Sequence, residues 1–203
     1  MDTSLTALAI SCTLKPSPAS SSSDLLARQL LDALGEHGVT GDLVRAVDFD
    51  IRPGVEKDMG GGDQWPTLRQ RVLDADILVL VTPTWMGQHS SVAQRVLERL
   101  DAELSETDEQ GRPILFDKVA IAGVLGNEDG AHHISAILFQ ALNDIGYTIP
   151  AQTSVYWNGE AMQTVDYKDL DETPEAVSSA IATASRNAAH LARQLTAQAY
   201  PAE

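Results

Sequence analysis

Short apolar runs alternate with amphipathic stretches along most of this chain. Residues 5–10, 76–82 and 118–125 are almost continuously apolar, which is typical of strands buried on both faces of a sheet. Residues 42–47 and 148–156 predict two further strands, and the first of these, being less apolar, is expected at a sheet edge. The pattern therefore predicts five strands.

Between these strands, apolar residues recur at intervals of three and four, as they do on the buried face of a helix. Serine and threonine caps, prolines in first turns and glycines at chain reversals mark the ends of these segments. The predicted helices cover residues 22–37, Pro66 to Leu73, Ser90 or Ser91 to Leu104, residues 134–145, and Thr173 to Leu195.

Strands that alternate with helices predict an α/β fold with three layers and a five-stranded parallel sheet. Right-handed crossovers favour the strand order 2-1-3-4-5, with the predicted strands numbered along the chain. We expect a single domain over residues 1–203, with a frayed tail from about residue 197. Residues 48–64, which include a Gly triplet, predict a long loop that covers a cleft together with Trp157.

The composition limits the classes of partner. Hydrophobic residues make up 43% of the chain and the formal net charge is −15, so a globular fold is expected and binding to nucleic acid or to an anionic membrane is disfavoured. The single cysteine, Cys12, excludes an internal disulfide and a cysteine-cluster metal site. Because the apolar runs are only strand-sized, we expect a soluble, cytoplasmic protein.

Three polar loops share one context, because each follows a predicted strand and precedes a predicted helix. They are residues 11–23, 82–88 and 126–133. The carboxyl ends of parallel strands meet at one edge of the sheet, where α/β proteins bind their ligands. We therefore expect the three loops to form one ligand site.

The first loop is rich in hydroxyl groups and lacks the glycine patterns of nucleoside triphosphate and dinucleotide sites. Free N–H groups at a helix N-terminus, together with neutral hydroxyl donors, suit a phosphate monoester. The alternative is that the serines only cap the helix. The candidate phosphate ligands are Ser11, Thr13, Ser17 and Ser20 to Ser23.

The second loop carries two large apolar side chains, Trp85 and Met86, between Pro83 and Gly87. Such side chains at the end of a central strand form a ledge for a planar ring, whose edge backbone N–H groups can bind. The alternative is that Trp85 belongs to the core or to a subunit contact.

In the third loop, Gly126 and Gly130 permit a close backbone approach, and residues 127–129 are expected to cap the following helix. Adjacent helical residues point about 100° apart, so His132 and His133 are poorly placed to bind one metal ion. We expect no metal site, and one of these histidines is expected to line the cleft.

Together these loops resemble those of the flavodoxin-like FMN-binding superfamily, and within it the NAD(P)H-dependent FMN reductase and quinone reductase branch. The likeness extends from Leu5 to about Leu195, although residues 15–18 lengthen the first loop and Lys15 adds a possible cation. The resemblance implies that Ser11, Thr13 and Ser20 to Ser22 hold the FMN phosphate, and that Pro83, Thr84, Trp85, Met86, Gly87, Gly126, Asn127 and Gly130 surround the isoalloxazine.

The resemblance also implies a reaction, in which NAD(P)H gives a hydride to bound FMN and a quinone, azo compound or free flavin then takes it. This chemistry requires no acid or base side chain, so His132, His133 and Tyr156 are candidates only for positioning the substrate. Members of this branch are often dimers or tetramers, so a homodimer or homotetramer is expected.

Two other functions remain open. A flavodoxin-type protein that carries single electrons between partners would suit the acidic charge, but the chain is only 5% aromatic. The same fold could also serve as an interaction module without a cofactor.

Overall fold

Five parallel strands form the central sheet of the computed structural model, which describes residues 4–202. Their order, β2-β1-β3-β5-β6, confirms the predicted flavodoxin-like arrangement, since β5 and β6 are the expected fourth and fifth strands. A two-residue strand, β4, pairs antiparallel with the end of β3. The strands are β1 (Leu5–Ser11), β2 (Val39–Arg45), β3 (Ile77–Trp85), β4 (Gln88–His89), β5 (Val119–Gly126) and β6 (Ser154–Asn158).

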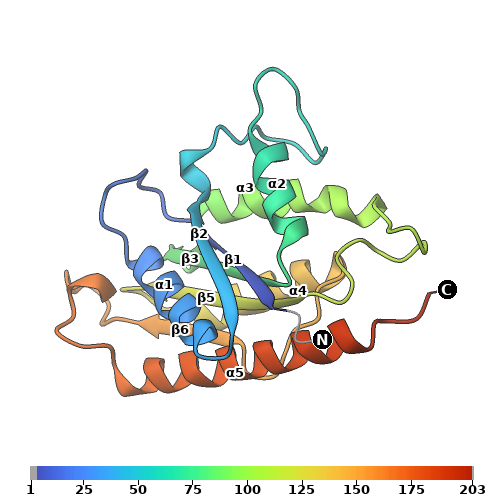
Figure 1. Cartoon of the computed structure of the whole chain (residues 1–203). Helices are drawn as coiled ribbons and strands as arrows, with labels where there is room; N and C mark the ends of the chain where they lie inside the picture. The colour runs from blue at the N-terminus through green and yellow to red at the C-terminus, as the bar shows by residue number, and fades with distance from the viewer. Residues whose placement is uncertain (1–3, 203) are drawn as a thin grey trace.

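Helices cover both faces of the sheet (Figure 1). One core lies between the sheet and α1 and α5, and a second lies between the sheet and α2, α3 and α4. Strand β1 serves both cores, because its side chains point alternately to the two faces. The helices are α1 (Ser22–Gly35), α2 (Trp65–Asp74), α3 (Ser91–Leu100), α4 (Ala131–Asp144) and α5 (Glu175–Ala197), with short 3-10 turns at Ala46–Asp48, Asp101–Ser105 and Tyr167–Asp169.

Several predicted boundaries differ from the structure. The predicted fifth strand began at residue 148, but Thr148 makes only an isolated bridge to Val119, and the chain turns before β6 starts at residue 154. Gln152 adopts a left-handed conformation in that turn, with φ of 60°. The third helix ends at Leu100 because the chain tightens into a 3-10 turn before Leu104 is reached.

The tail predicted to fray from about residue 197 follows α5, and one of its residues, Tyr200, contacts the sheet. The backbone N–H of Tyr200 donates to Asp117 at 2.8 Å, and its hydroxyl hydrogen-bonds to Thr148 at 2.9 Å. Its ring also packs against Phe116, with 5.2 Å between the ring centroids. These contacts attach the tail to the amino-end edge of the sheet.

The long loop at residues 49–64 was expected over the cleft, but a buried ion pair fixes it above α3 instead. Arg99 Nη1 lies 2.7 Å from Asp63 Oδ2, and both side chains are fully buried. Arg99 also donates to the carbonyls of Arg52 and Glu56. Figure 1 shows this loop on the α2–α3 side of the sheet, away from the carboxyl ends of the central strands.

None of the helices within residues 4–202 is both long enough and apolar enough to cross a membrane.

Candidate functional site

A cavity of about 260 Å³ opens at the carboxyl edge of the sheet. This volume lies just below the range of about 300–1,000 Å³ typical of small-molecule sites. All three loops that the sequence placed at this edge contribute to it, joined by the segment that follows β6. The lining residues are Thr13 to Lys15, Ser20 to Ser23, Pro83 to Trp85, Leu125 to Glu128, Trp157 and Asp166 to Lys168.

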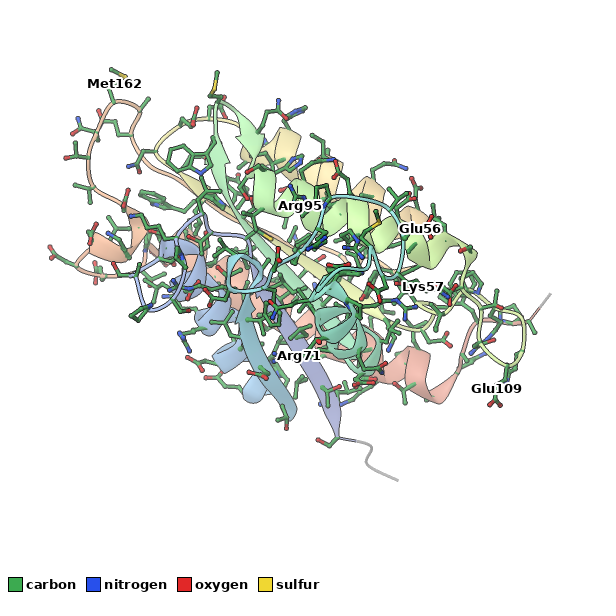
Figure 2. The ribbon with its side chains drawn as sticks, turned by 90° about the horizontal axis from the view of Figure 1, so that it is seen from above. Glu56, Lys57, Arg71, Arg95, Glu109 and Met162 are labelled. Carbon is green, nitrogen blue, oxygen red and sulfur yellow. The ribbon has the colours of Figure 1, made fainter. Side chains whose placement is uncertain are left out.

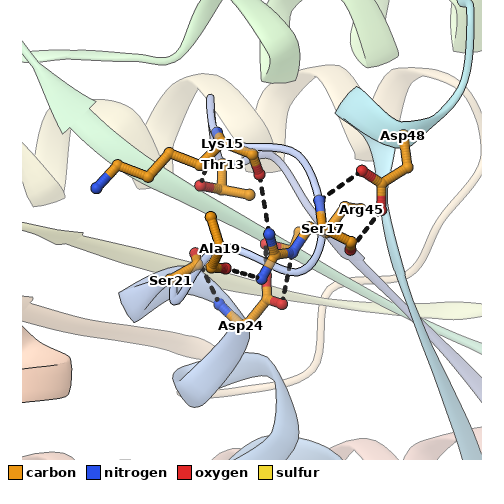
Figure 3. A network of polar contacts seen from close by, with 9 residues as sticks. Thr13, Lys15, Ser17, Ala19, Ser21, Asp24, Arg45 and Asp48 are labelled. Carbon is orange, nitrogen blue, oxygen red and sulfur yellow. Dashed lines mark hydrogen bonds and ion pairs between the residues drawn. The ribbon is translucent and has the colours of Figure 1, made fainter.

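A buried polar network supports the first loop from below (Figure 3). Asp24, in the first turn of α1, forms an ion pair with Arg45, with 2.7 Å between Oδ2 and Nε. Arg45 also donates to the carbonyls of Lys15 and Ala19. The guanidinium thus joins two points of the loop to α1, and Arg45 is only 8% exposed.

Ser11 belongs to this network and does not line the cavity. Its hydroxyl donates to Asp24 Oδ1 at 2.6 Å, and the residue is fully buried. The sequence-based assignment of Ser11 as a phosphate ligand is therefore not supported by its position. Ser17 is also engaged elsewhere, because its hydroxyl donates to Asp48 at 2.6 Å. That hydrogen bond, above all, lowers the pKa of the Asp48 carboxyl.

The other hydroxyls of the loop do reach the cavity, and we call Thr13 and Ser20 to Ser23 its serine end. Ser21 is the N-cap of α1, and its oxygen accepts from the Asp24 N–H at 3.4 Å. The Ser22 oxygen accepts from the backbone N–H of Lys168 at 3.3 Å. Because both oxygens accept from backbone N–H groups, both O–H groups remain available to donate to a ligand.

At the opposite end, Trp85 and Trp157 contribute apolar surface; we call Pro83 to Trp85, Leu125 to Asn127 and Trp157 the tryptophan end. Two polar atoms there, Thr84 Oγ1 and Asn127 Oδ1, are buried and have no hydrogen-bond partner within residues 4–202. Burying a polar atom without a partner costs about 1–3 kcal/mol. These atoms are therefore suited to a ligand that supplies the missing hydrogen bonds.

Met86 and Gly87, both expected at the ring, form the tip of the β3–β4 hairpin and do not line the cavity. Both adopt left-handed conformations, with φ of 54° and 72°. Their N–H groups donate to the Glu128 carboxylate at 2.7 and 3.2 Å. Glu128 therefore ties the second loop to the third instead of capping α4.

Gly130 also lies outside the cavity lining and allows these two loops to approach. Its φ is 142°, and a Cβ at this position would lie 2.9 Å from the Gly87 backbone. Only glycine fits that contact without displacing the hairpin.

The histidine and tyrosine candidates lie outside the cavity lining. His132 Nε2 lies 3.0 Å from the Tyr156 hydroxyl, and the two rings pack edge to face. His133 Nε2 lies 3.2 Å from Gln88 Oε1 on β4. Within residues 4–202, no group of three or more His, Cys, Asp or Glu side chains is placed to hold a metal ion.

The segment between β6 and α5 also lines the cavity, through Asp166, Tyr167 and Lys168, none of which was predicted from the sequence. The one signal for this segment in the sequence is weak: Lys168 is the only lysine after residue 118. The Tyr167 hydroxyl donates to Gln29 on α1 at 2.7 Å. Burial raises the pKa of Tyr167, so its hydroxyl stays a neutral donor.

Two curated proteins are similar in sequence to this chain. The "Divalent metal cation transporter MntH" of Mycobacterium bovis is 44% identical over 169 residues, which cover 81% of this chain and 25% of that protein. The "8-demethyl-8-aminoriboflavin-5'-phosphate synthase" of Streptomyces davaonensis is 32% identical over 166 residues, which cover 77% of this chain and 65% of that protein. This chain therefore corresponds to only part of each of these relatives.

Among solved structures, RosB with the bound intermediate 8-demethyl-8-formylriboflavin-5'-phosphate aligns with a TM-score of 0.87. It is 30% identical to this chain, and the alignment covers 97% of this chain and 82% of RosB. The model of the NADPH-dependent FMN reductase family matches residues 5–161, which span β1 to the end of β6 and include the three loops that line the cavity, but not the lining residues Asp166 to Lys168. The expected branch is thereby confirmed, and the chain belongs to the NADPH-dependent FMN reductase family.

Proposed function

We propose that this protein is an FMN-dependent oxidoreductase that passes a hydride from NADH or NADPH, through bound FMN, to a small-molecule acceptor. A quinone, an azo compound and a free flavin are the acceptor classes. The observation that carries the proposal is one cavity with hydroxyl donors at its serine end and unpartnered polar atoms beside indole rings at its tryptophan end. Membership of the FMN reductase family supports the same cofactor.

The residues present fit FMN at both ends. The O–H groups of Ser21 and Ser22, at the N-terminus of α1, suit a phosphate, since the free N–H groups and the helix dipole there favour an anion. Thr84 Oγ1 and Asn127 Oδ1 suit the polar edge of the isoalloxazine, where both would gain the partners that they lack. Trp157 offers an apolar surface beside them.

When bound, FMN supplies the hydride chemistry, and the protein supplies position and electrostatics. The Arg45 network fixes the loop that carries the serine end. Glu128 fixes the β3–β4 hairpin against the loop after β5. Trp85 stands at the mouth with 55% of its surface exposed, where it can contact a second, planar substrate.

The direct test is the absorbance spectrum of the purified protein with added FMN. We expect a yellow complex that bleaches under anaerobic conditions with NADH or NADPH and regains its colour when a quinone is added. A protein that stays colourless and leaves the spectrum of added FMN unchanged contradicts the proposal.

Tryptophan fluorescence gives an independent reading of where FMN binds. Two of the three tryptophans, Trp85 and Trp157, line the cavity, whereas Trp65 is the first residue of α2 and is fully buried in the core. We expect FMN to quench the emission, with less quenching in W85F and W157F. The matched control W65F should keep the quenching of the other two indoles, and equal quenching in all three variants contradicts this site.

A second candidate function is chemical modification of the flavin itself. The similarity to RosB favours it, because that structure holds a riboflavin 5'-phosphate derivative described as an intermediate. The two functions differ in what happens to FMN. After many turnovers, mass spectrometry of the released flavin should show unchanged FMN if it is a cofactor, and an altered benzenoid ring if it is a substrate.

A further inference from the structure

The segment between β6 and α5 completes one side of the cavity. The family match ends at residue 161, so Tyr167 and Lys168 lie outside the matched part of the chain. The Tyr167 ring packs against Trp157, with 5.6 Å between the ring centroids, and its hydroxyl reaches α1 through Gln29. Contacts with β6 and α1, which both contribute residues to the cavity, therefore hold this segment in place.

Lys168 is a cationic residue that lines the cavity next to the serine end. Its backbone N–H donates to Ser22 Oγ, which places it beside the first turn of α1, and its side chain is 19% exposed. Its ammonium pairs with Asp166, at 3.4 Å, and with Asp169. An ammonium has three donor hydrogens, so one remains for a ligand in the cavity.

The other cations near the serine end are less suited to this role. The Arg45 guanidinium is buried and already binds Asp24 and two loop carbonyls. Lys15 lines the cavity, but it is an exposed residue whose ammonium has no hydrogen bond or ion pair to any of residues 4–202. A flexible exposed cation contributes little to binding, because fixing its side chain costs entropy.

We propose that Lys168 is a specificity-determining residue that selects flavins carrying a 5'-phosphate, by pairing with the phosphate held at the serine end. The inference rests on the proposed function. In a chain with a net charge of −15, a phosphate needs a nearby cation to offset the surrounding carboxylates. Lys168 is the side chain whose burial, fixed backbone and position next to Ser22 fit that need.

The carboxylates of Asp166 and Asp169, which pair with Lys168, affect both its protonation and its ability to bind a phosphate. The hydrogen bond to Asp169, above all, raises the pKa of Lys168, so the ammonium stays protonated at neutral pH. Both aspartates also compete with a phosphate for the ammonium. Removing the carboxylate of Asp169, which is 53% exposed, should therefore strengthen phosphate binding.

The test compares the affinities of the intact protein for FMN and for riboflavin, measured by fluorescence titration. We expect K168Q to weaken FMN binding by about 10- to 100-fold, the range for loss of one charge-assisted hydrogen bond, and to leave riboflavin binding unchanged. D169N should bind FMN at least as tightly as the wild type. The matched control is K57Q, which removes an equal charge from the loop above α3 and breaks the ion pair between Lys57 and Glu106. Figure 2 shows Lys57 far from Met162, which marks the loop between β6 and α5.

Each outcome decides one question. An FMN affinity of K168Q within threefold of the wild type, or an equal loss for FMN and riboflavin, overturns the role of Lys168. If K57Q weakens FMN binding as much as K168Q does, the effect is one of overall charge and the inference is also overturned. A wild-type protein that binds neither flavin instead contradicts the proposed function.

Discussion

Arg45 on β2 and Asp24 in the first turn of α1 form an ion pair that is buried on both sides, with side-chain exposures of 8% and 10%. A carboxylate at this position is favourable for the helix but lies close to the serine end, where it would repel a phosphate. Arg45 neutralises that charge and binds two loop carbonyls at the same time. The pair therefore leaves the N-terminus of α1 electrostatically suited to the phosphate that we propose it binds.

Replacing Arg45 with methionine should destabilise the protein by about 3–5 kcal/mol, because it leaves the charge of Asp24 buried and unpaired. It should also weaken FMN binding, since the loop loses its anchor. Urea denaturation and FMN titration measure the two effects. The double variant R45M/D24N should regain part of the stability, and a double variant less stable than R45M contradicts the explanation.

The variant Thr84→Val should affect FMN binding without reducing the stability of the fold. Thr84 Oγ1 is buried without a partner, so an isosteric methyl should leave the free energy of unfolding unchanged or raise it. If this hydroxyl binds the flavin, FMN affinity should fall by about tenfold, which corresponds to one hydrogen bond. Fluorescence titration and thermal unfolding, performed on the same sample, give both numbers.

Thr82→Val is the matched control on the same strand. Thr82 Oγ1 accepts from the Ser90 N–H at 3.0 Å at the start of α3, and it does not line the cavity. This variant should lose about 1 kcal/mol of stability. It should bind FMN normally. A T84V protein that is destabilised as much as T82V would show that Thr84 has a partner inside the fold.

Gly130→Ala should disturb the contact between the second and third loops. With φ of 142°, any side chain is strained by about 1–3 kcal/mol, and the new Cβ would meet the Gly87 backbone at 2.9 Å. Thermal unfolding should show a clear loss of stability. Gly111→Ala is the comparison, because its φ is 79° but its Cβ would point into open space. Equal losses in both variants would mean that the close contact contributes nothing.

The strand pattern predicted the order of the sheet and the convergence of the three loops, because buried parallel strands leave a strong apolar signal. Which side chains line the cavity depends on long-range contacts, and the spacing of residues along the sequence does not predict these contacts. Ser11 points away from the cavity because its hydroxyl donates to Asp24, 13 residues later in the chain. Met86 lies outside the cavity because it belongs to the turn of the β3–β4 hairpin. Lys168 reaches the cavity through a hydrogen bond to Ser22, 146 residues earlier in the chain.

The loop above α3 should give the protein a specific sensitivity to acid. Burial opposes ionisation of Asp63, but hydrogen bonds from the Met59 and Arg52 N–H groups and from Arg99 outweigh it and lower the pKa of Asp63 to about 2. The ordinary pKa of aspartate is about 3.9. The carboxylate therefore contributes stability that is fully present above about pH 4 and is lost as the pH falls towards 2.

Asp63→Asn tests this contribution. At pH 7 the variant should be less stable by about 3–5 kcal/mol, because Arg99 keeps its buried charge and loses its ion partner. The difference from the wild type should shrink as the pH falls from 4 to 2, since the wild-type carboxyl is protonated in that interval. Urea denaturation at several pH values measures it, with D171N at an exposed position as the control for one lost charge. A difference that stays constant down to pH 2 would mean that the ionised form of Asp63 does not stabilise the loop.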